Sequence, residues 1–100
     1  EHSQSTAISH AYALRSKAYL VQCEWQKAIQ DAKLATKLVD VASSKTLSMA
    51  YRSWIDAEEG IGSHPRDVIP VLQSWFKAQP EYRTKLKAEI TDWAQRAEKQ

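Results

Sequence analysis

Side chains that ligate metals or act as nucleophiles at neutral pH are few in this chain of 100 residues. Apart from the carboxylates of Asp and Glu, they are Cys23 and the three histidines, His2, His10 and His64. A zinc site needs Cys or His ligands in pairs a few residues apart, and these four side chains form no such pair. A nucleophilic cysteine needs a histidine partner, which the sequence does not indicate. We therefore expect no catalytic residue, no metal site and no cofactor, and no enzymatic activity.

Phosphate and nucleic-acid chemistry is also weakly represented. The "GIG" at 60–62 has neither the preceding strand nor the following Gly-Lys of a phosphate-binding loop. The formal net charge of +2 is too small for a basic nucleic-acid-binding surface. The segment 81–98 interleaves Arg83, Lys85, Lys87 and Arg96 with Glu81, Glu89, Asp92 and Glu98. This is typical of a solvated helix with ion pairs, so RNA binding is the weakest alternative.

Membrane and targeting signals are missing from the given sequence. No apolar run approaches the roughly 18 residues that a membrane helix needs, and "EHSQST" lacks the basic-then-apolar order of a signal peptide. The first residue is Glu1 rather than Met, which indicates a fragment or a processed chain. A single cysteine, Cys23, permits no internal disulfide and is compatible with the reducing cytoplasm. We expect a cytoplasmic protein without membrane insertion, of undetermined oligomeric state.

The elements that must position any site are expected to be helices. The chain has only two glycines and three prolines, and it is rich in the residues that favour helices. Apolar residues recur with helical spacing in five segments. The expected helices cover residues 6–21, 25–38, 45–59, 66–78 and 81–98. Short links join the first to the second and the third to the fourth, which predicts two antiparallel hairpins and a last helix.

Helix ends are indicated by capping residues. Ser43 or Ser44 can cap the third helix, and Gly60 or Gly62 can end it in a left-handed conformation. Proline is harmless only in the first turn of a helix. Pro70 therefore predicts that the regular part of the fourth helix starts at 67. Cys23, at the first turn, is expected to pack as a small apolar residue.

Four tryptophans are many for a chain of this length. Trp25, Trp54 and Trp93 lie on the apolar stripes of their helices and are expected in the core. Trp75 is ambiguous. It occupies a crossing that favours a small residue, so it either forces a hairpin apart or points between the last two helices.

Small side chains occupy the face of 15–38 that should be buried. This pattern resembles the tetratricopeptide repeat family, whose unit is a pair of antiparallel helices of about 34 residues. The axes of two packed helices usually lie about 8–10 Å apart, and small residues at the crossing would allow the near end of that range. The residues that carry the resemblance are Tyr12, Ser16, Tyr19, Trp25, Ala28 and Ala35.

A second, degenerate unit follows the first. "AYALRSKA" at 11–18 can be aligned with "AYRSWIDA" at 50–57, which pairs the first and last alanines of the two stretches. A rival register pairs Arg15-Ser16 with Arg52-Ser53. We set it aside because it places Asp56 where Tyr19 stands on the buried stripe. In the second unit Val68 and Trp75 replace the usual alanines.

The resemblance implies an all-α fold of two antiparallel helix-turn-helix repeats and a C-terminal capping helix, part of a right-handed α-solenoid. It implies one domain over 1–98, with repeats at 7–40 and 44–80 and the capping helix at 81–98. A plain bundle of three to five helices with an alanine-rich seam is the alternative.

Repeats of this kind bind partners on their concave surface, which is lined by the first helix of each pair. The expected function is a protein–protein interaction module, an adaptor or scaffold that holds a protein or peptide. Ala13, Leu20 and Ser53 are also expected on the groove side. The predicted binding residues are His10, Leu14, Lys17, Val21, Met49, Arg52 and Asp56.

Docking of the acidic C-terminus of the chaperones Hsp70 or Hsp90 is the alternative function. The stretch 13–35 is similar to the middle repeat of co-chaperones that use this mode. Their two-carboxylate clamp consists of Lys, Asn and Arg. Here Leu14 stands where the clamp asparagine is expected, and Met49 and Ser53 stand where a lysine and an arginine are expected.

Overall fold

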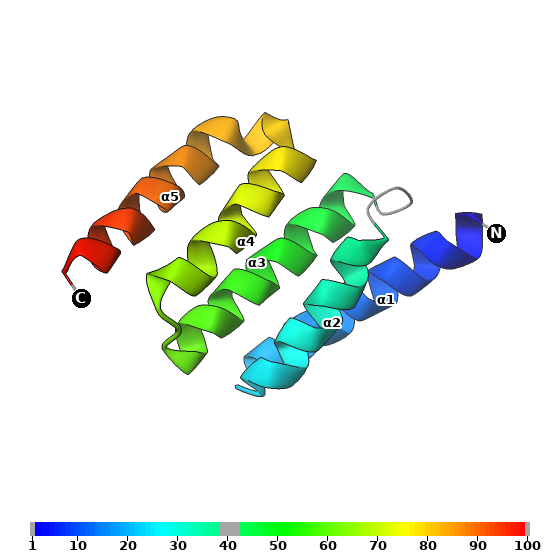
Figure 1. The fold of residues 1–100 in the computed structure, drawn as a ribbon. Helices are drawn as coiled ribbons and strands as arrows, with labels where there is room; N and C mark the ends of the chain where they lie inside the picture. Colours follow the sequence, from blue (N-terminus) through cyan, green and yellow to red (C-terminus); the bar gives the residue numbers. More distant parts are fainter. Residues whose placement is uncertain (1, 39–42, 100) are drawn as a thin grey trace.

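A computed structural model describes residues 2–38 and 43–99, which form five α-helices and a short 3₁₀ turn (Figure 1). No strand occurs among these residues, so the predicted all-α class is confirmed. The elements are α1 (His2–Val21), α2 (Trp25–Lys37), α3 (Ser44–Ile61), α4 (Pro65–Ala78), η1 (Pro80–Tyr82) and α5 (Arg83–Glu98). The first helix is longer than predicted, since it already includes His2.

Consecutive helices run antiparallel and pack side by side. In Figure 1, α2, α3, α4 and α5 follow one another across the molecule, and α1 passes behind α2. Helix α3 contacts α1, α2 and α4, whereas α5 contacts α4 and η1. The molecule measures 47 × 30 × 16 Å, so its helices spread into a flat array. This spread leaves two broad faces and two edge helices, α1 and α5.

The ends of α3 follow the predicted signals. The Ser43 hydroxyl accepts a hydrogen bond of 3.1 Å from the backbone N–H of Thr46. At the other end Gly62 takes φ 84°, a left-handed conformation that glycine adopts at little cost. Its N–H donates to the carbonyls of Glu58 and Glu59.

Helix α4 begins earlier than predicted. Pro65 is its first residue, and the ring Nδ1 of His64 accepts from the backbone N–H of Arg66 at 3.1 Å. The prediction of a start at Asp67 is wrong. Pro70 lies inside the helix, where it removes one hydrogen bond to the carbonyl of Arg66. Both residues are exposed, so the missing bond falls on the side that faces water.

Small residues do lie at the crossing of α1 and α2. Ser16, Ala28 and Ala35 have no exposed surface, as predicted. The Ser16 hydroxyl donates to the carbonyl of Ala28 at 2.7 Å, and Ser9 donates to the carbonyl of Ala35 at 3.2 Å. These bonds join side chains of α1 directly to the backbone of α2. The two helices therefore approach with no large side chain between them.

The buried small residues of α1 recur on α3 at a constant offset. The matched positions, 37 residues apart, carry small side chains and share near-complete burial, and two of the three pairs are identical in residue type. The residues on α1 are Ser9, Ala13 and Ser16, and those on α3 are Thr46, Ala50 and Ser53.

This offset is the register in which Arg15-Ser16 matches Arg52-Ser53. The register predicted from 11–18 and 50–57 is wrong, because Ala11 and Ala18 are exposed whereas their counterparts on α3 are buried. The register that pairs Arg15-Ser16 with Arg52-Ser53 was set aside because it places Asp56 on a buried stripe. The Asp56 side chain is 42% exposed, so this register does not bury an unsolvated carboxylate.

The larger part of the core lies between α3, α4 and α5. Trp75 belongs to it, with 3% of its surface exposed. Its ring stacks on Tyr51 of α3 with centroids 5.8 Å apart and meets Tyr82 of η1 at 6.0 Å. Trp93 is also buried as predicted, whereas Trp25 and Trp54 are only partly buried.

Gln79, at the end of α4, is the polar centre of this region and is 2% exposed. Its side-chain oxygen accepts from the indole N–H of Trp75 at 2.8 Å and from the Ser48 hydroxyl at 3.0 Å. Its amide nitrogen donates to the carbonyl of Ser44 at 2.8 Å. One amide thus ties the end of α4 to the start of α3.

Gly60 lies inside α3 against the indole ring of Trp25. A Cβ at this position would come within 2.8 Å of ring atoms of Trp25. Only glycine lets the ring approach the helix backbone so closely. The glycine therefore fixes how α2 sits on the C-terminal half of α3.

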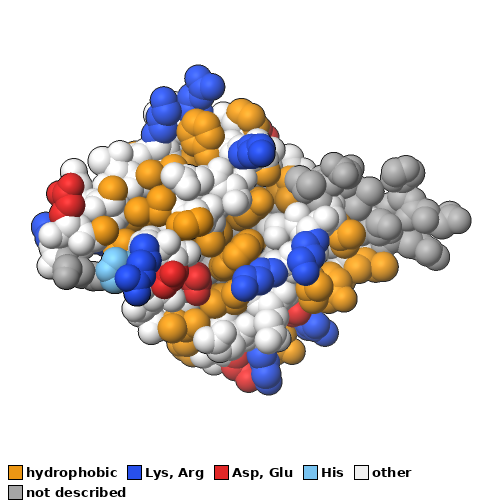
Figure 2. Space-filling view, viewed as in Figure 1, with side chains coloured by type: hydrophobic (Ala, Val, Ile, Leu, Met, Phe, Trp, Pro, Cys, Tyr) orange, Lys and Arg blue, Asp and Glu red, His pale blue; other side chains and the backbone are white. Residues whose placement is uncertain are grey.

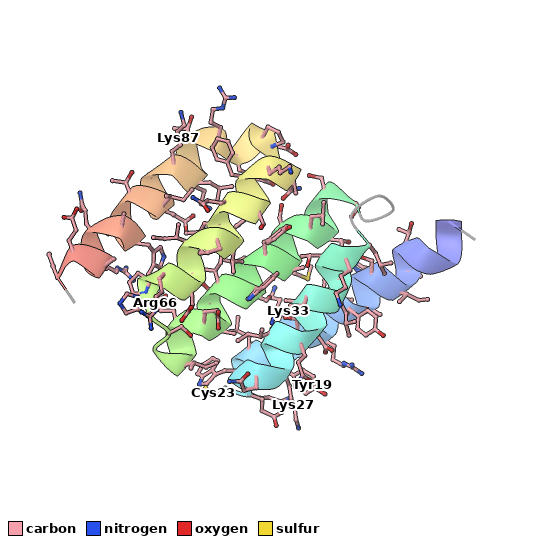
Figure 3. All side chains as sticks on the ribbon, viewed as in Figure 1. Tyr19, Cys23, Lys27, Lys33, Arg66 and Lys87 are labelled. Atoms are coloured by element: carbon pink, nitrogen blue, oxygen red, sulfur yellow. The ribbon has the colours of Figure 1, made fainter. Side chains whose placement is uncertain are left out.

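Cys23 does not pack in the core, so that prediction is wrong. It is exposed at the turn between α1 and α2 and takes φ 61°. Its N–H donates to the carbonyl of Leu20 at 3.0 Å and helps to end α1. Tyr19 and Lys27 lie at the same end of the molecule (Figure 3). At the end of α1, in this left-handed conformation, the Cys23 side chain is exposed to solvent.

Candidate functional site

A hollow of about 440 Å³ opens between α1, α3, η1 and α5. Its apolar lining consists of Leu20, Met49 and the edges of Trp75 and Tyr82. Its polar lining consists of Lys17, Lys45, Ser48, Arg52, Ser53, Asp56 and Lys85. We call this the α1–α3–α5 hollow. Three other hollows on the described part of the chain are smaller, at about 360, 280 and 160 Å³.

Four of the seven predicted binding residues line this hollow: Lys17, Met49, Arg52 and Asp56. The additional groove residues Leu20 and Ser53 line it as well.

The other three predicted residues lie elsewhere. The His10 ring nitrogen Nδ1 is 3.0 Å from the Thr46 hydroxyl, a contact between α1 and α3. Leu14 is 47% exposed and Val21 is 77% exposed, and neither lines the hollow. Ala13, which was also expected on the groove side, is fully buried between helices. On α1 the hollow is therefore lined by Lys17 and Leu20 only, between Leu14 and Val21.

Arg52 forms one wall of the hollow. Its guanidinium donates to both carboxylate oxygens of Glu89 on α5, at 3.0 and 2.7 Å. It also lies over the ring of Trp75, 4.9 Å from the centroid. The hydrogen bond that Arg52 donates to Glu89 raises the pKa of Arg52, against the opposing effect of burial. Arg52 therefore links α3 to α5 across the hollow. Part of its hydrogen-bonding capacity is already used by Glu89 and is not free for a ligand.

Asp56 is the only carboxylate that lines the hollow among the described residues. Partial burial raises its pKa, and the nearby Arg52 guanidinium, 4.0 Å away, opposes that shift. The carboxylates of Glu59 and Glu89 add to the upward shift. The surroundings of Asp56 thus stabilise its ionised form less than water does.

Three lysines surround the hollow, one each from α1, α3 and α5. None of the ion pairs among the described residues involves Lys17, Lys45 or Lys85. All three side chains are exposed. The rim therefore offers ammonium groups beside an apolar floor that contains Trp75 and Met49. Such a combination suits a ligand that carries both negative charge and an apolar group.

Sequence reasoning missed several lining residues, namely Lys45, Ser48, Trp75, Tyr82 and Lys85. Trp75 belongs to the second helix of its pair, and Tyr82 and Lys85 belong to the segment expected to act only as a solvated cap. Lys45 and Ser48 lie on the first helix of the second unit, but the face assigned to the groove did not include them. Glu81 and Glu89 stand four positions before and after Lys85, so the charge pattern of the sequence carried no signal that Lys85 lines a hollow.

The buried acid Asp31 is not a candidate acid or base. Both of its oxygens accept from Arg15 of α1, from Nε at 2.6 Å and from Nη2 at 2.9 Å. The rings of Tyr12 and Tyr19 flank the same guanidinium at 5.7 and 5.8 Å. The bond to Asp31 raises the pKa of Arg15. This cluster holds α1 on α2.

Metal and membrane sites find no support in the described residues. They contain no group of three or more His, Cys, Asp or Glu side chains placed to hold a metal ion. None of the helices in the described ranges combines the length and apolar character needed to cross a bilayer.

Comparisons of this chain with protein-family models, with curated proteins and with solved structures find no match. The candidate function therefore depends on the geometry of the α1–α3–α5 hollow and on the resemblance carried by the residues.

Proposed function

We propose that this chain is a tetratricopeptide-like adaptor module that binds a partner protein by holding a short peptide segment in the α1–α3–α5 hollow. The observation that carries the proposal is the hollow itself, with an apolar floor and three lysines that lack carboxylate partners in the described chain. Antiparallel helix pairs joined in chain order, with small residues at the α1–α2 crossing, are compatible with a helical repeat.

The chemistry of the hollow favours an acidic segment with one apolar side chain. The apolar group would pack on Met49 and Trp75, and burial of apolar surface contributes roughly 25 cal/mol per Å². Carboxylates would pair with Lys17, Lys45 and Lys85 at the rim, where each exposed pair contributes roughly 0.2–1 kcal/mol. The expected complex is therefore of moderate affinity and sensitive to salt.

Docking of a chaperone C-terminus stays the second candidate. The rim lysines favour it, because such a ligand ends in acidic residues and a free carboxylate. The departure at Leu14 counts against it, since that residue lies outside the hollow altogether. Met49 and Ser53 supply no charge at the positions where the clamp needs it.

A charge reversal on α5 tests the proposed function with a matched control. Lys85 lines the hollow, whereas Lys87 points away from the other helices (Figure 3). We expect Lys85→Glu to weaken binding of a fluorescent acidic-apolar peptide severalfold and Lys87→Glu to leave it nearly unchanged, with equal melting temperatures for both variants. Equal weakening by both variants would mean that only the net charge of the protein matters, and it would contradict binding in the hollow.

The same titration separates the two candidates. A peptide with a free C-terminal carboxylate and its amidated form are compared. Preference for the free acid supports chaperone-type docking, and equal binding supports an internal acidic segment as the ligand. Arg52→Glu is unsuitable as a probe of binding, because Arg52 pairs with Glu89 and its loss alters the hollow itself.

A further inference from the structure

Helix α1 presents several large aliphatic residues to solvent, whereas the residues that it buries are small. Ile8, Leu14 and Val21 are 49%, 47% and 77% exposed. Among residues 6–21 of this helix, those that are fully buried are Ser9, Ala13 and Ser16. A helix at the surface of a folded protein normally shows the opposite distribution, and a helix that is apolar on all sides is normally covered on all sides.

The exposed apolar residues have the spacing of a helix–helix seam. They follow one another at intervals of four, three, four and three residues, which keeps them on one line along the helix. All of them are exposed, and Figure 2 shows apolar side chains at the surface near the edge where α1 emerges from behind α2. We call them the α1 outer stripe: Ala7, Ala11, Leu14, Ala18 and Val21.

A small hollow beside this stripe supplies a separate indication of a helical ligand. It measures about 160 Å³ and is lined by Ile8, Ala11, Tyr12 and Arg15. These four residues stand at positions i, i+3, i+4 and i+7 of one helix. Four residues in that arrangement form the hole that receives one side chain, the knob, of a facing helix.

The charges beside the stripe are positive. Helix α1 contains Arg15 and Lys17 and no Asp or Glu between His2 and Val21. Lys17 takes part in no ion pair of the described residues, and Arg15, whose bonds to Asp31 use Nε and Nη2, keeps 58% of its side-chain surface exposed. A second copy of α1 would bring like charges together. An acidic helix would find complementary partners.

We infer that the α1 outer stripe is the docking surface for one amphipathic helix of a partner, with small and medium apolar residues along its seam and Asp or Glu at the flanking positions. None of the five stripe residues lines the α1–α3–α5 hollow, and the two surfaces share only the flanking Lys17. The inference goes beyond the proposed function, because it predicts a second ligand of a different shape, a helix rather than an extended peptide.

The test compares two synthetic helical peptides of about three heptads. Both carry the same Ala and Leu seam, one with Glu and the other with Lys at the flanking positions. Binding is measured by fluorescence polarisation on the whole chain. Leu14→Gln alters the stripe, and Leu34→Gln is the matched control, since Leu34 is 38% exposed but lies on α2.

We expect the Glu-flanked peptide to bind and the Lys-flanked peptide to bind at least about tenfold more weakly, because two like-charge contacts oppose it. Leu14→Gln should lower affinity for the Glu-flanked peptide by about tenfold or more, and Leu34→Gln should not. Equal binding of both peptides, equal effects of both substitutions, or no binding at all would overturn the inference. A concentration-dependent dimer that Leu14→Gln abolishes would also overturn it, in favour of a second copy.

Discussion

The hydroxyl of Ser16 on α1 donates a hydrogen bond of 2.7 Å to the backbone carbonyl of Ala28 on α2, and neither residue has exposed surface. The contact is a side chain of one helix on the main chain of another. It can form only because residue 28 has no side chain beyond Cβ. The small residues of this segment thus set the distance between α1 and α2.

Enlarging the crossing should destabilise the protein. Ala28→Leu forces a branched side chain into a site with no free surface, and overpacking of this kind costs about 1–3 kcal/mol in the free energy of unfolding. The measurement is urea denaturation followed by circular dichroism. Ala88→Leu, at an exposed position of α5, is the control and should stay within about 0.5 kcal/mol of the wild type. Equal stability of both variants would contradict the close approach of α1 and α2.

Gly60→Ala should also destabilise the protein, although alanine is the better helix former by about 1 kcal/mol. The new Cβ would lie 2.8 Å from ring atoms of Trp25. We expect the clash to exceed the gain in helix propensity, with a net loss of about 1–2 kcal/mol on thermal or urea unfolding.

A double variant tests whether the ring is the cause. Trp25→Leu removes the indole, so Gly60→Ala should be neutral or stabilising in that background. Gly62→Ala serves as a contrast. No atom lies within 4 Å of its would-be Cβ, but φ is 84°, so its cost arises from backbone strain and should not depend on Trp25.

Gln79 should be intolerant of an apolar replacement of similar size. Gln79→Met would leave the indole N–H of Trp75 without its hydrogen-bond acceptor in a buried site. Loss of such partners costs about 1–3 kcal/mol in the free energy of unfolding. Gln73→Met, at an exposed position of the same helix, should be nearly neutral. A shift of tryptophan fluorescence should accompany the Gln79 variant only.

Asp56 should make stability depend on pH. Burial raises its pKa above the ordinary value of about 3.9, so the native state binds this proton more tightly than the unfolded state does. The contribution is favourable below about pH 4 and is lost as the pH rises through the raised pKa of the native state. Asp56→Asn removes this dependence.

The difference in free energy of unfolding between Asp56→Asn and the wild type should therefore move in favour of the variant between pH 4 and pH 7. Denaturation curves at several pH values within that window measure it. A constant difference, or a change in the opposite direction, would mean that Arg52 rather than burial dominates the environment of Asp56.

Much of the helical framework was predictable because its signals are local. Ser43 and Gly62 end α3 through their own side chain or conformation, and apolar spacing identified the helices. The repeat register was not predictable from residue types, because Ala11 and Ala13 are chemically alike and only packing distinguishes the exposed one from the buried one. The burial of Gln79 was not predicted, because a polar residue before a proline is typical of an exposed loop.

The candidate site was predictable in part for a similar reason. Lys17 and Met49 follow from the faces of two helices, which periodicity gives. Tyr82 and Lys85 depend on where the last helix sits, and no local pattern specifies that. The environment of Trp75 likewise depends on Tyr51, which lies on α3, and on Gln79, which follows α4. These residues are far apart in the sequence and meet only in the folded chain.

The order of helix contacts has a kinetic consequence. Every helix packs against its neighbour in the chain, and the more distant contacts described join helices two apart, α1 with α3 and α3 with α5. Folding therefore requires no closure of long loops, and proteins with such local contacts fold in microseconds to milliseconds. Helix α5 contributes the buried Leu86 and Trp93 to the core that it shares with α3 and α4, so any opening of this end of the chain would expose apolar surface as well as break the ion pairs to α3.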